Sequence, residues 1–192
     1  EILKRGRERA PGGKTAKGSR ILGKSYTELG RVYLEQGELR KAMDVLKSAE
    51  ENNPGDPKTL HYLGLLYTEY KKYNQAYDYL AKALKLQPHN AKIMRDLAFV
   101  YSEKGDMTLA LSAAKKSIMY DPANPEGYEL LSKILLKLGN YNEAVNALDE
   151  GLKNCPEGMD YIWWLKGGLS SERGDWEKAV ESYRQAIRYN DE

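Results

Sequence analysis

The stretch from Leu60 to Asn90 has the clearest hydrophobic pattern in the chain. Leu60, Leu63, Gly64 and Tyr67 lie at positions i, i+3, i+4 and i+7, which form one face of an α-helix. Two lysines then interrupt the pattern. A second run follows, with apolar residues at helical spacing: Tyr73, Ala76, Leu80, Ala83, Leu84 and Leu86. A proline and an asparagine end this run, so the stretch predicts a helix, a turn and a second helix.

The same unit recurs with a period of 34 residues. A shift by one period aligns tyrosines, alanines and prolines: Tyr33, Tyr67 and Tyr101; Ala42, Ala76 and Ala110; Pro54, Pro88 and Pro122. The period continues through Leu135, Ala144 and Pro156. We therefore expect five repeats, over residues 23–56, 57–90, 91–124, 125–158 and 159–192.

The turn inside each repeat has its own signal. A glycine, which readily takes the left-handed conformation that ends a helix, occupies this place in four repeats: Gly37, Gly105, Gly139 and Gly174. The second repeat has Lys71 there instead, so we expect slight strain at this turn.

This period resembles the tetratricopeptide repeat family, which has a small residue in the first helix, an alanine in the second and a proline near its end. The matching pairs in the first helix are Leu29-Gly30, Leu63-Gly64, Leu97-Ala98 and Leu131-Ser132. The resemblance covers about nine tenths of the chain. It implies an all-α fold, a right-handed superhelical solenoid of antiparallel helix pairs that binds a peptide or a partner helix in its concave groove.

The two ends of the predicted array are less regular. We expect residues 1–22 to contain the last turns of a helix from a preceding repeat, because the spacing from Leu3 to Gly6 to Pro11 recurs in the fourth repeat. Residues 14–22 would then form a linker or an extended start of the next helix. On this interpretation the chain is a fragment of a longer array.

The fifth repeat fits the period in two ways. Counted back from Gly174, it places Trp163 and Gly167 at consensus positions. Counted forward from Pro156, it gains a better apolar face: Ile162, Leu165 and Leu169. The sequence leaves both alternatives open.

Successive residues of an α-helix are 100° apart around its axis. In each first helix, one set of positions therefore packs on other helices, and a second set points away from them. The resemblance implies that the face of this second set lines the groove, which also includes Glu129 and, if the fifth repeat keeps phase, Tyr161. We predict the following partner-binding residues: Arg31, Leu34, Lys58, His61, Leu65, Lys92, Arg95, Phe99, Glu103, Lys133, Leu136 and Trp164. Apolar residues on a face not needed for packing indicate binding, although neighbouring helices could instead cover them. Phe99, with Arg95 beside it, is the expected anchor.

The charge distribution argues against nucleic acid or membrane partners. The net charge is +2, so no global field draws the chain to phosphates or lipid headgroups. Residues 1–24 carry eight Lys or Arg against two Glu, but they lack the aromatic interleaving of single-strand binders. We expect the partner to be another protein or peptide.

Signals for catalysis, cofactors and metals are weak. Residues 12–15 imitate the end of a phosphate-binding loop, but Glu8 stands where that loop needs a glycine. His61 and His89 have no Cys or carboxylate at ligand spacing. We therefore expect no enzyme activity, no cofactor and no metal. Cys155 is the only cysteine, which excludes an internal disulfide and favours a reducing, cytoplasmic compartment.

Three functional interpretations follow. The leading one is a protein–protein interaction scaffold that binds its partner in the groove. The alternative is the substrate-presenting or assembly arm of a larger enzyme or export machine, because a fold alone does not fix a function. The third is self-association through the repeats.

Overall fold

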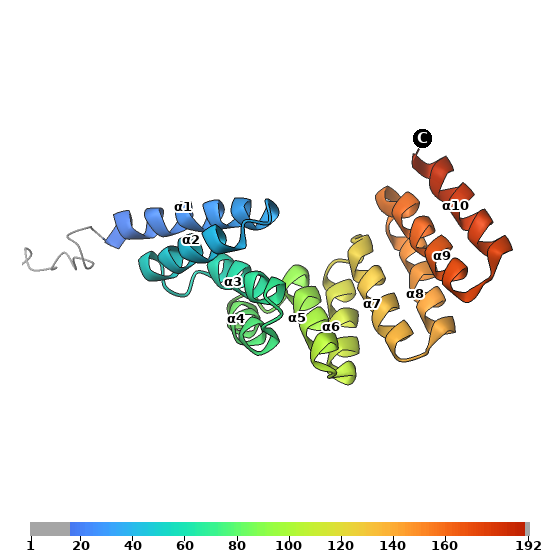
Figure 1. Ribbon diagram of the computed structural model, residues 1–192, viewed down its shortest axis with the longest axis horizontal. Helices are drawn as coiled ribbons and strands as arrows, with labels where there is room; N and C mark the ends of the chain where they lie inside the picture. The colour runs from blue at the N-terminus through green and yellow to red at the C-terminus, as the bar shows by residue number, and fades with distance from the viewer. Residues whose placement is uncertain (1–15, 191–192) are drawn as a thin grey trace, which may run out of the picture. The chain divides into compact units, whose positions relative to one another are not determined.

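The computed structural model describes residues 16–190, with side chains from Gly18 onward, and this part of the chain is all-α (Figure 1). Its elements are α1 (Ala16–Glu35), α2 (Leu39–Asn52), α3 (Pro57–Glu69), α4 (Tyr73–Leu86), α5 (Ala91–Lys104), α6 (Met107–Tyr120), α7 (Pro125–Lys137), α8 (Tyr141–Asn154), the short 3₁₀ helix η1 (Pro156–Gly158), α9 (Met159–Arg173) and α10 (Trp176–Asn190). Contacts divide the chain into unit 1, residues 1–88 with α1–α4, and unit 2, residues 89–192 with α5–α10.

Each unit is a solenoid of antiparallel helix pairs (Figure 1). The two helices of a pair pack on each other, and the second helix also packs on the first helix of the next pair within the unit, as α6 does on α7. The expected all-α solenoid class is therefore confirmed. None of the described helices combines the length and apolar character that crossing a bilayer requires.

A small residue lets the two helices of a pair approach closely. A Cβ atom on Gly30 would lie 2.5 Å from Cγ of Leu46, and one on Gly64 would lie 2.6 Å from Cγ of Leu80. In both pairs the leucine follows its glycine by sixteen positions. The repeated small residue of the sequence is therefore the contact point between helices, which explains why larger residues are not found there.

Capping side chains and left-handed residues set the helix ends. Asp56 accepts a hydrogen bond from the Thr59 backbone N–H at 3.0 Å, at the start of α3. Lys71 has a φ of 55° and is, within residues 16–190, the one residue other than glycine with positive φ. The expected strain at this turn thus has a structural basis, because a side chain in this conformation costs about 1–2 kcal/mol.

The first helix begins earlier than a standard repeat requires. Residues 16–22 form its first turns. Ser19 Oγ donates to the Asn52 carbonyl at 3.0 Å, so these turns are held against the end of α2. The predicted helix end over residues 1–10 lies outside the described residues.

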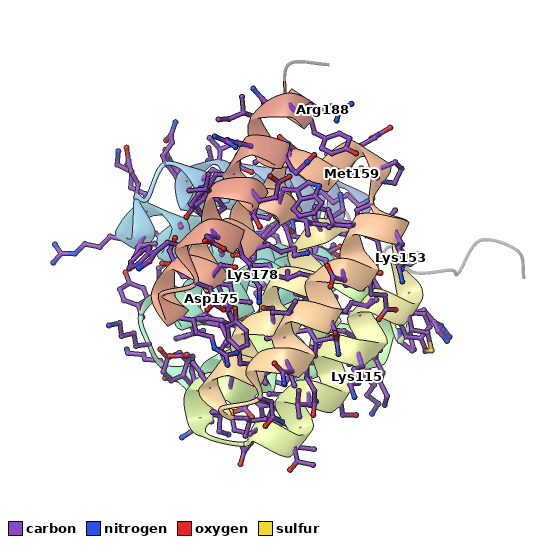
Figure 2. The ribbon with its side chains drawn as sticks, turned by 90° about the vertical axis from the view of Figure 1, so that its right-hand side faces the viewer. Lys115, Lys153, Met159, Asp175, Lys178 and Arg188 are labelled. Atoms are coloured by element: carbon purple, nitrogen blue, oxygen red, sulfur yellow. The ribbon has the colours of Figure 1, made fainter. Side chains whose placement is uncertain are left out.

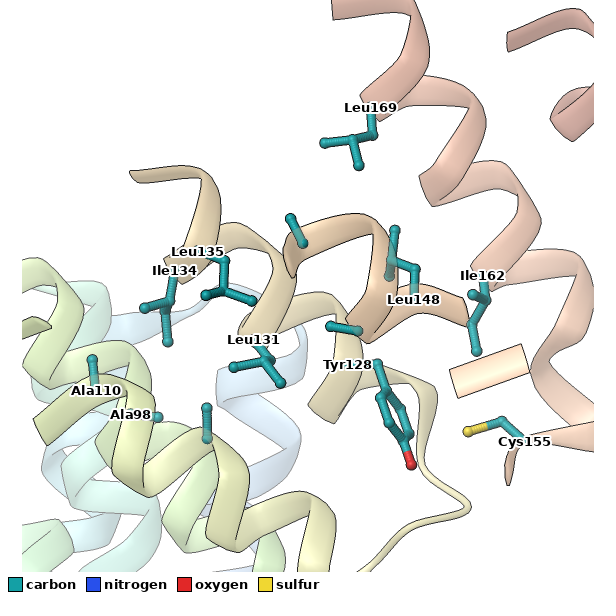
Figure 3. Packing of buried hydrophobic residues seen from close by; sticks show 13 residues of the cluster. Ala98, Ala110, Tyr128, Leu131, Ile134, Leu135, Leu148, Cys155, Ile162 and Leu169 are labelled. Atoms are coloured by element: carbon teal, nitrogen blue, oxygen red, sulfur yellow. The ribbon is translucent and has the colours of Figure 1, made fainter. Parts of the chain in front are cut away.

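Unit 2 contains an extended apolar core (Figure 3). Tyr128 is completely buried in it, with its hydroxyl donating to the Pro122 carbonyl at 3.0 Å and accepting from Asn154 Nδ2 at 2.9 Å. Cys155 Sγ lies 3.5 Å from the same carbonyl. Burial raises the pKa of the Cys155 thiol, and nearby Asp121 adds to this effect. The loop before α7 is therefore fixed by two buried side chains from α7 and the end of α8.

The position of Gly167 shows which of the two possible registers the fifth helix pair has. A Cβ atom on this residue would lie 2.6–2.8 Å from three ring atoms of Tyr183, again sixteen positions later. Counting back from Gly174 therefore gives the packing register. The extra residue lies in α9, which has 15 residues before its left-handed glycine, whereas α5 has 14.

Candidate partner-binding groove

The first helices of unit 2 lie side by side, α5 against α7 and α7 against α9. Two cavities open on this row, and together we call them the unit 2 groove. The Phe99 cavity, about 280 Å³, is lined by Arg95, Asp96, Phe99, Glu126, Glu129, Leu130 and Lys133. The Trp164 cavity, about 230 Å³, is lined by Glu129, Ser132, Lys133, Leu136, Leu148, Trp164, Leu165, Gly168, Leu169 and Glu172. Because Glu129 and Lys133 line both cavities, the cavities are neighbours.

Each cavity has an exposed aromatic side chain in its wall. Phe99 is 40% exposed on α5, and Trp164 is 55% exposed on α9. The Trp164 ring stacks on Tyr161, with ring centroids 5.9 Å apart. Large rings left open to water beside a cavity are typical of binding surfaces rather than of helix packing.

Glu129 is the polar centre of the groove. Its carboxylate accepts hydrogen bonds from Tyr161 Oη at 2.6 Å and from Lys133 Nζ at 2.5 Å. Burial alone would raise the pKa of Glu129, but these two bonds favour the charged form and bring the pKa below its ordinary value. Burial, together with the bond to this carboxylate, raises the pKa of Tyr161. The groove therefore holds an ionised carboxylate between its two aromatic side chains.

Two predicted basic residues of unit 2, Arg95 and Lys133, and the predicted carboxylate Glu103 are engaged in ion pairs. Arg95 Nη1 pairs with Glu126, which belongs to the next first helix. Lys137 Nζ lies 2.6 Å from Glu103, another pair between α5 and α7. A partner could recruit such charges only by exchanging existing bonds, so they add orientation more than affinity. The apolar walls are left as the main source of binding energy.

The predicted groove residues of unit 1 form a different surface. Arg31 pairs with Glu28 at 3.1 Å and with Glu35 at 2.6 Å, and Lys58 reaches Glu28 at 3.4 Å. Leu34 and Leu65 are half-buried, with Leu34 packed on the core of the unit. His61 is only 7% exposed and stacks on Tyr62, so it offers a partner almost no surface. The unit 1 residues thus gather charge around Glu28, and the exposed aromatic positions of the predicted set lie in unit 2.

Some residues of the unit 2 groove escaped the sequence prediction. Glu126 occupies the second position of its repeat, as Lys58 and Lys92 do, so register alone could have identified it. Leu130 and Glu172 lie outside the positions assigned to the groove, and only the packing of α7 against α5 and α9 brings them into its walls. Lys92 of the predicted set is exposed at the start of α5.

Residues 16–190 hold no group of three or more His, Cys, Asp or Glu side chains arranged to bind a metal ion.

Comparisons with solved structures agree with this fold. A thermophilic TPR protein of Thermus thermophilus superposes with a TM-score of 0.74 at 20% identity, covering 87% of this chain and 91% of its own. MamA from Desulfovibrio magneticus RS-1 gives 0.67 at 20% identity, covering 88% and 94%. YrrB, described as a TPR protein with an unusual peptide-binding site, gives 0.58 at 21% identity, covering 85% and 84%. At such identities the likeness concerns the fold.

Family models of the tetratricopeptide repeat match residues 24–66, 67–112, 103–163 and 166–192. No curated protein sequence matches the chain. Together with the helix pairs and their small contact residues, these matches show that the chain belongs to the tetratricopeptide repeat family, whose members are generally non-enzymatic protein-interaction scaffolds.

Proposed function

We propose that this protein binds a segment of a partner protein along the unit 2 groove, with one apolar partner side chain in the Phe99 cavity and another in the Trp164 cavity. The observation that carries the proposal is the pair of neighbouring cavities, each with an exposed aromatic wall, that share Glu129 and Lys133.

The energetic argument rests on desolvation. Leu136, Leu165 and Leu169 give the Trp164 cavity an apolar wall, so an entering side chain exchanges water for hydrocarbon. Aromatic anchors with an arginine nearby are enriched among interface residues whose truncation costs about 2 kcal/mol or more. Phe99 and Arg95 line one cavity and match this composition. The unit 2 groove is therefore expected to derive most of its affinity from a few central contacts.

Glu129 would orient the bound segment. Glu129 lines both cavities, and its carboxylate already accepts bonds from Tyr161 and Lys133. A carboxylate has room for further donors, so a backbone N–H or a basic side chain of the partner can bond to it between the two anchors. The peptide-binding site described for YrrB, a neighbour in fold, supports peptide binding as a role for such an array.

A site-specific cross-linking experiment tests the proposal. A photoreactive amino acid at Leu136, in the wall of the groove, should capture a partner, whereas the same group at Leu109, 50% exposed on α6, should not. Calorimetry with the purified partner then compares variants. Phe99→Ala and Trp164→Ala should each weaken binding at least about tenfold, while Leu109→Ala should leave it unchanged.

Thermal melts of the same variants separate binding from folding. Both aromatic side chains are well exposed, so their truncation should lower stability only slightly. Reduced stability with unchanged affinity would assign these rings to packing and would refute groove binding.

A further inference from the structure

The last helix presents an apolar surface outside the unit 2 groove. Trp176, Val180 and Ile187 of α10 are 67%, 51% and 64% exposed, and half-buried Tyr183 lies between them along the same face. The spacings of four, three and four residues place all four side chains on one side of the helix. We call this set the α10 stripe. Figure 2 faces this end of the molecule, where α10 follows Asp175 and runs past Lys178 to Arg188.

The inner repeats show what such a stripe does. The same register positions in α8 hold Tyr141, Val145, Leu148 and Leu152, which belong to the core of unit 2 or pack against it where α9 covers α8. The corresponding residues of α6 lie in or against the same core, where α7 covers α6. The α10 stripe therefore has the composition of a surface that binds a helix, yet most of its side chains are open to solvent in the described part of the chain.

The flank of the stripe carries charges that restrict the covering helix. Glu177 and Arg184 lie seven residues apart, beside the stripe on the side away from α9. At the position of Arg184 in the preceding repeat, Asp149 of α8 pairs with Lys166 of the covering helix α9. The repeat architecture thus already places an ion pair between this flank and the helix above it, and a helix that covers α10 should bring a carboxylate to Arg184.

We propose that the α10 stripe binds the α10 stripe of a second copy of this chain, in an antiparallel arrangement with two-fold symmetry. Trp176 of one copy then faces Ile187 of the other, and Val180 faces Tyr183, so the four apolar residues match one another. The charged residues beside the stripe, Glu177 and Arg184, match as well.

In this antiparallel geometry Glu177 of one copy lies opposite Arg184 of the other, and symmetry forms this pair twice. A parallel arrangement would instead bring Arg184 beside Ala179, without an opposite charge. Charge complementarity therefore selects the antiparallel pair. Ile187 lines a cavity together with Tyr161 and Trp164 of α9, whereas Glu177 and Arg184 line neither cavity of the unit 2 groove. Variants of these two charges therefore test dimer formation separately from groove binding.

Charge reversal on the 192-residue chain gives a sharp test by sedimentation equilibrium. The wild-type chain should show a monomer–dimer equilibrium. Glu177→Arg and Arg184→Glu should each raise the dissociation constant by about tenfold or more, because two attractive pairs become repulsive. Mixing the two variants should restore dimers, since each then meets the opposite charges of the other.

Two controls complete the test. Glu181→Arg makes the same charge change further round the helix and should leave the dissociation constant unchanged, while Ile187→Glu should abolish the dimer. Circular dichroism establishes that each variant keeps its helices. A wild-type chain that stays monomeric at its highest soluble concentration, or reversal variants that do not dimerise when mixed, would overturn the proposal.

Discussion

The ring of Tyr183 lies directly over Gly167, where a Cβ atom would come within 2.6–2.8 Å of three ring atoms. The neighbouring Gly168 has its nearest such contact at 3.8 Å. Gly167→Ala should therefore destabilise the protein by about 1–3 kcal/mol through overpacking. Gly168→Ala should stabilise it by up to about 1 kcal/mol, because alanine favours the helix. Urea unfolding of both variants measures the difference, and equal effects would contradict the register of the last helix pair.

At the turn that contains Lys71, a glycine should stabilise the protein. Lys71→Gly should raise the free energy of unfolding by about 1 kcal/mol, because glycine tolerates the positive φ of 55° without the Cβ clash. Lys72 has a φ of −91° and serves as the matched control. Lys72→Gly should give no such gain, since glycine only adds freedom to the unfolded chain there.

Acid should weaken the contribution of Glu129 to folding. The folded-state pKa of this carboxyl lies below its ordinary value of 4.5, after the bonds from Lys133 and Tyr161 outweigh the effect of burial. Its stabilising effect is therefore full above pH 4.5 and is lost as the pH falls through the folded-state pKa. Glu129→Gln should make the fall in stability below pH 4.5 less steep in chemical denaturation.

Tyr161→Phe provides the companion variant for that titration. It removes one of the two donors to Glu129 and keeps the ring that stacks on Trp164. The acid slope should then fall between those of the wild type and Glu129→Gln. An unchanged slope in both variants would show that other carboxylates carry the acid sensitivity.

The buried hydroxyl of Tyr128 should be worth about 1 kcal/mol of stability, because Tyr128→Phe leaves the Pro122 carbonyl and the Asn154 amide without this partner. Cys155 offers an independent readout, since its thiol is 1% exposed and contacts the same carbonyl. Its labelling by a thiol reagent should become faster in the variant. Tyr120→Phe, at a site 38% exposed, should change neither quantity.

The sequence predicted the helix pairs well because its period resides in the side chains that make the contacts. The position of Gly64 holds a small residue in each repeat because it lies against the second helix of the pair, here against Leu80. The turn glycines recur because the turn inside a helix pair has a positive φ, and four of these five turns have a glycine there. The sequence left the register of the fifth repeat open for a physical reason. The extra residue lies inside α9, where both alignments keep apolar side chains buried, and only the contact with Tyr183 separates them.

The candidate site was harder to predict, since its properties depend on neighbouring helices. The pattern placed Phe99 and Trp164 on the groove side, and the structure leaves both rings open to solvent. The pattern could not show that His61 is buried, nor that Arg95 is paired with Glu126 from the next first helix. Burial and ion pairing across repeats depend on how closely two helices approach, which the periodicity of one helix does not contain.

The packing of each helix on its sequence neighbours also bears on how fast the protein folds. Within each unit, the principal contacts join a helix to the other helix of its pair or to a helix of the next pair. Contacts of this kind close only short loops, so little chain entropy is lost before each pair begins to bury its side chains. Low contact order is associated with folding in microseconds to milliseconds. An emerging chain could therefore complete one pair before the next leaves the ribosome.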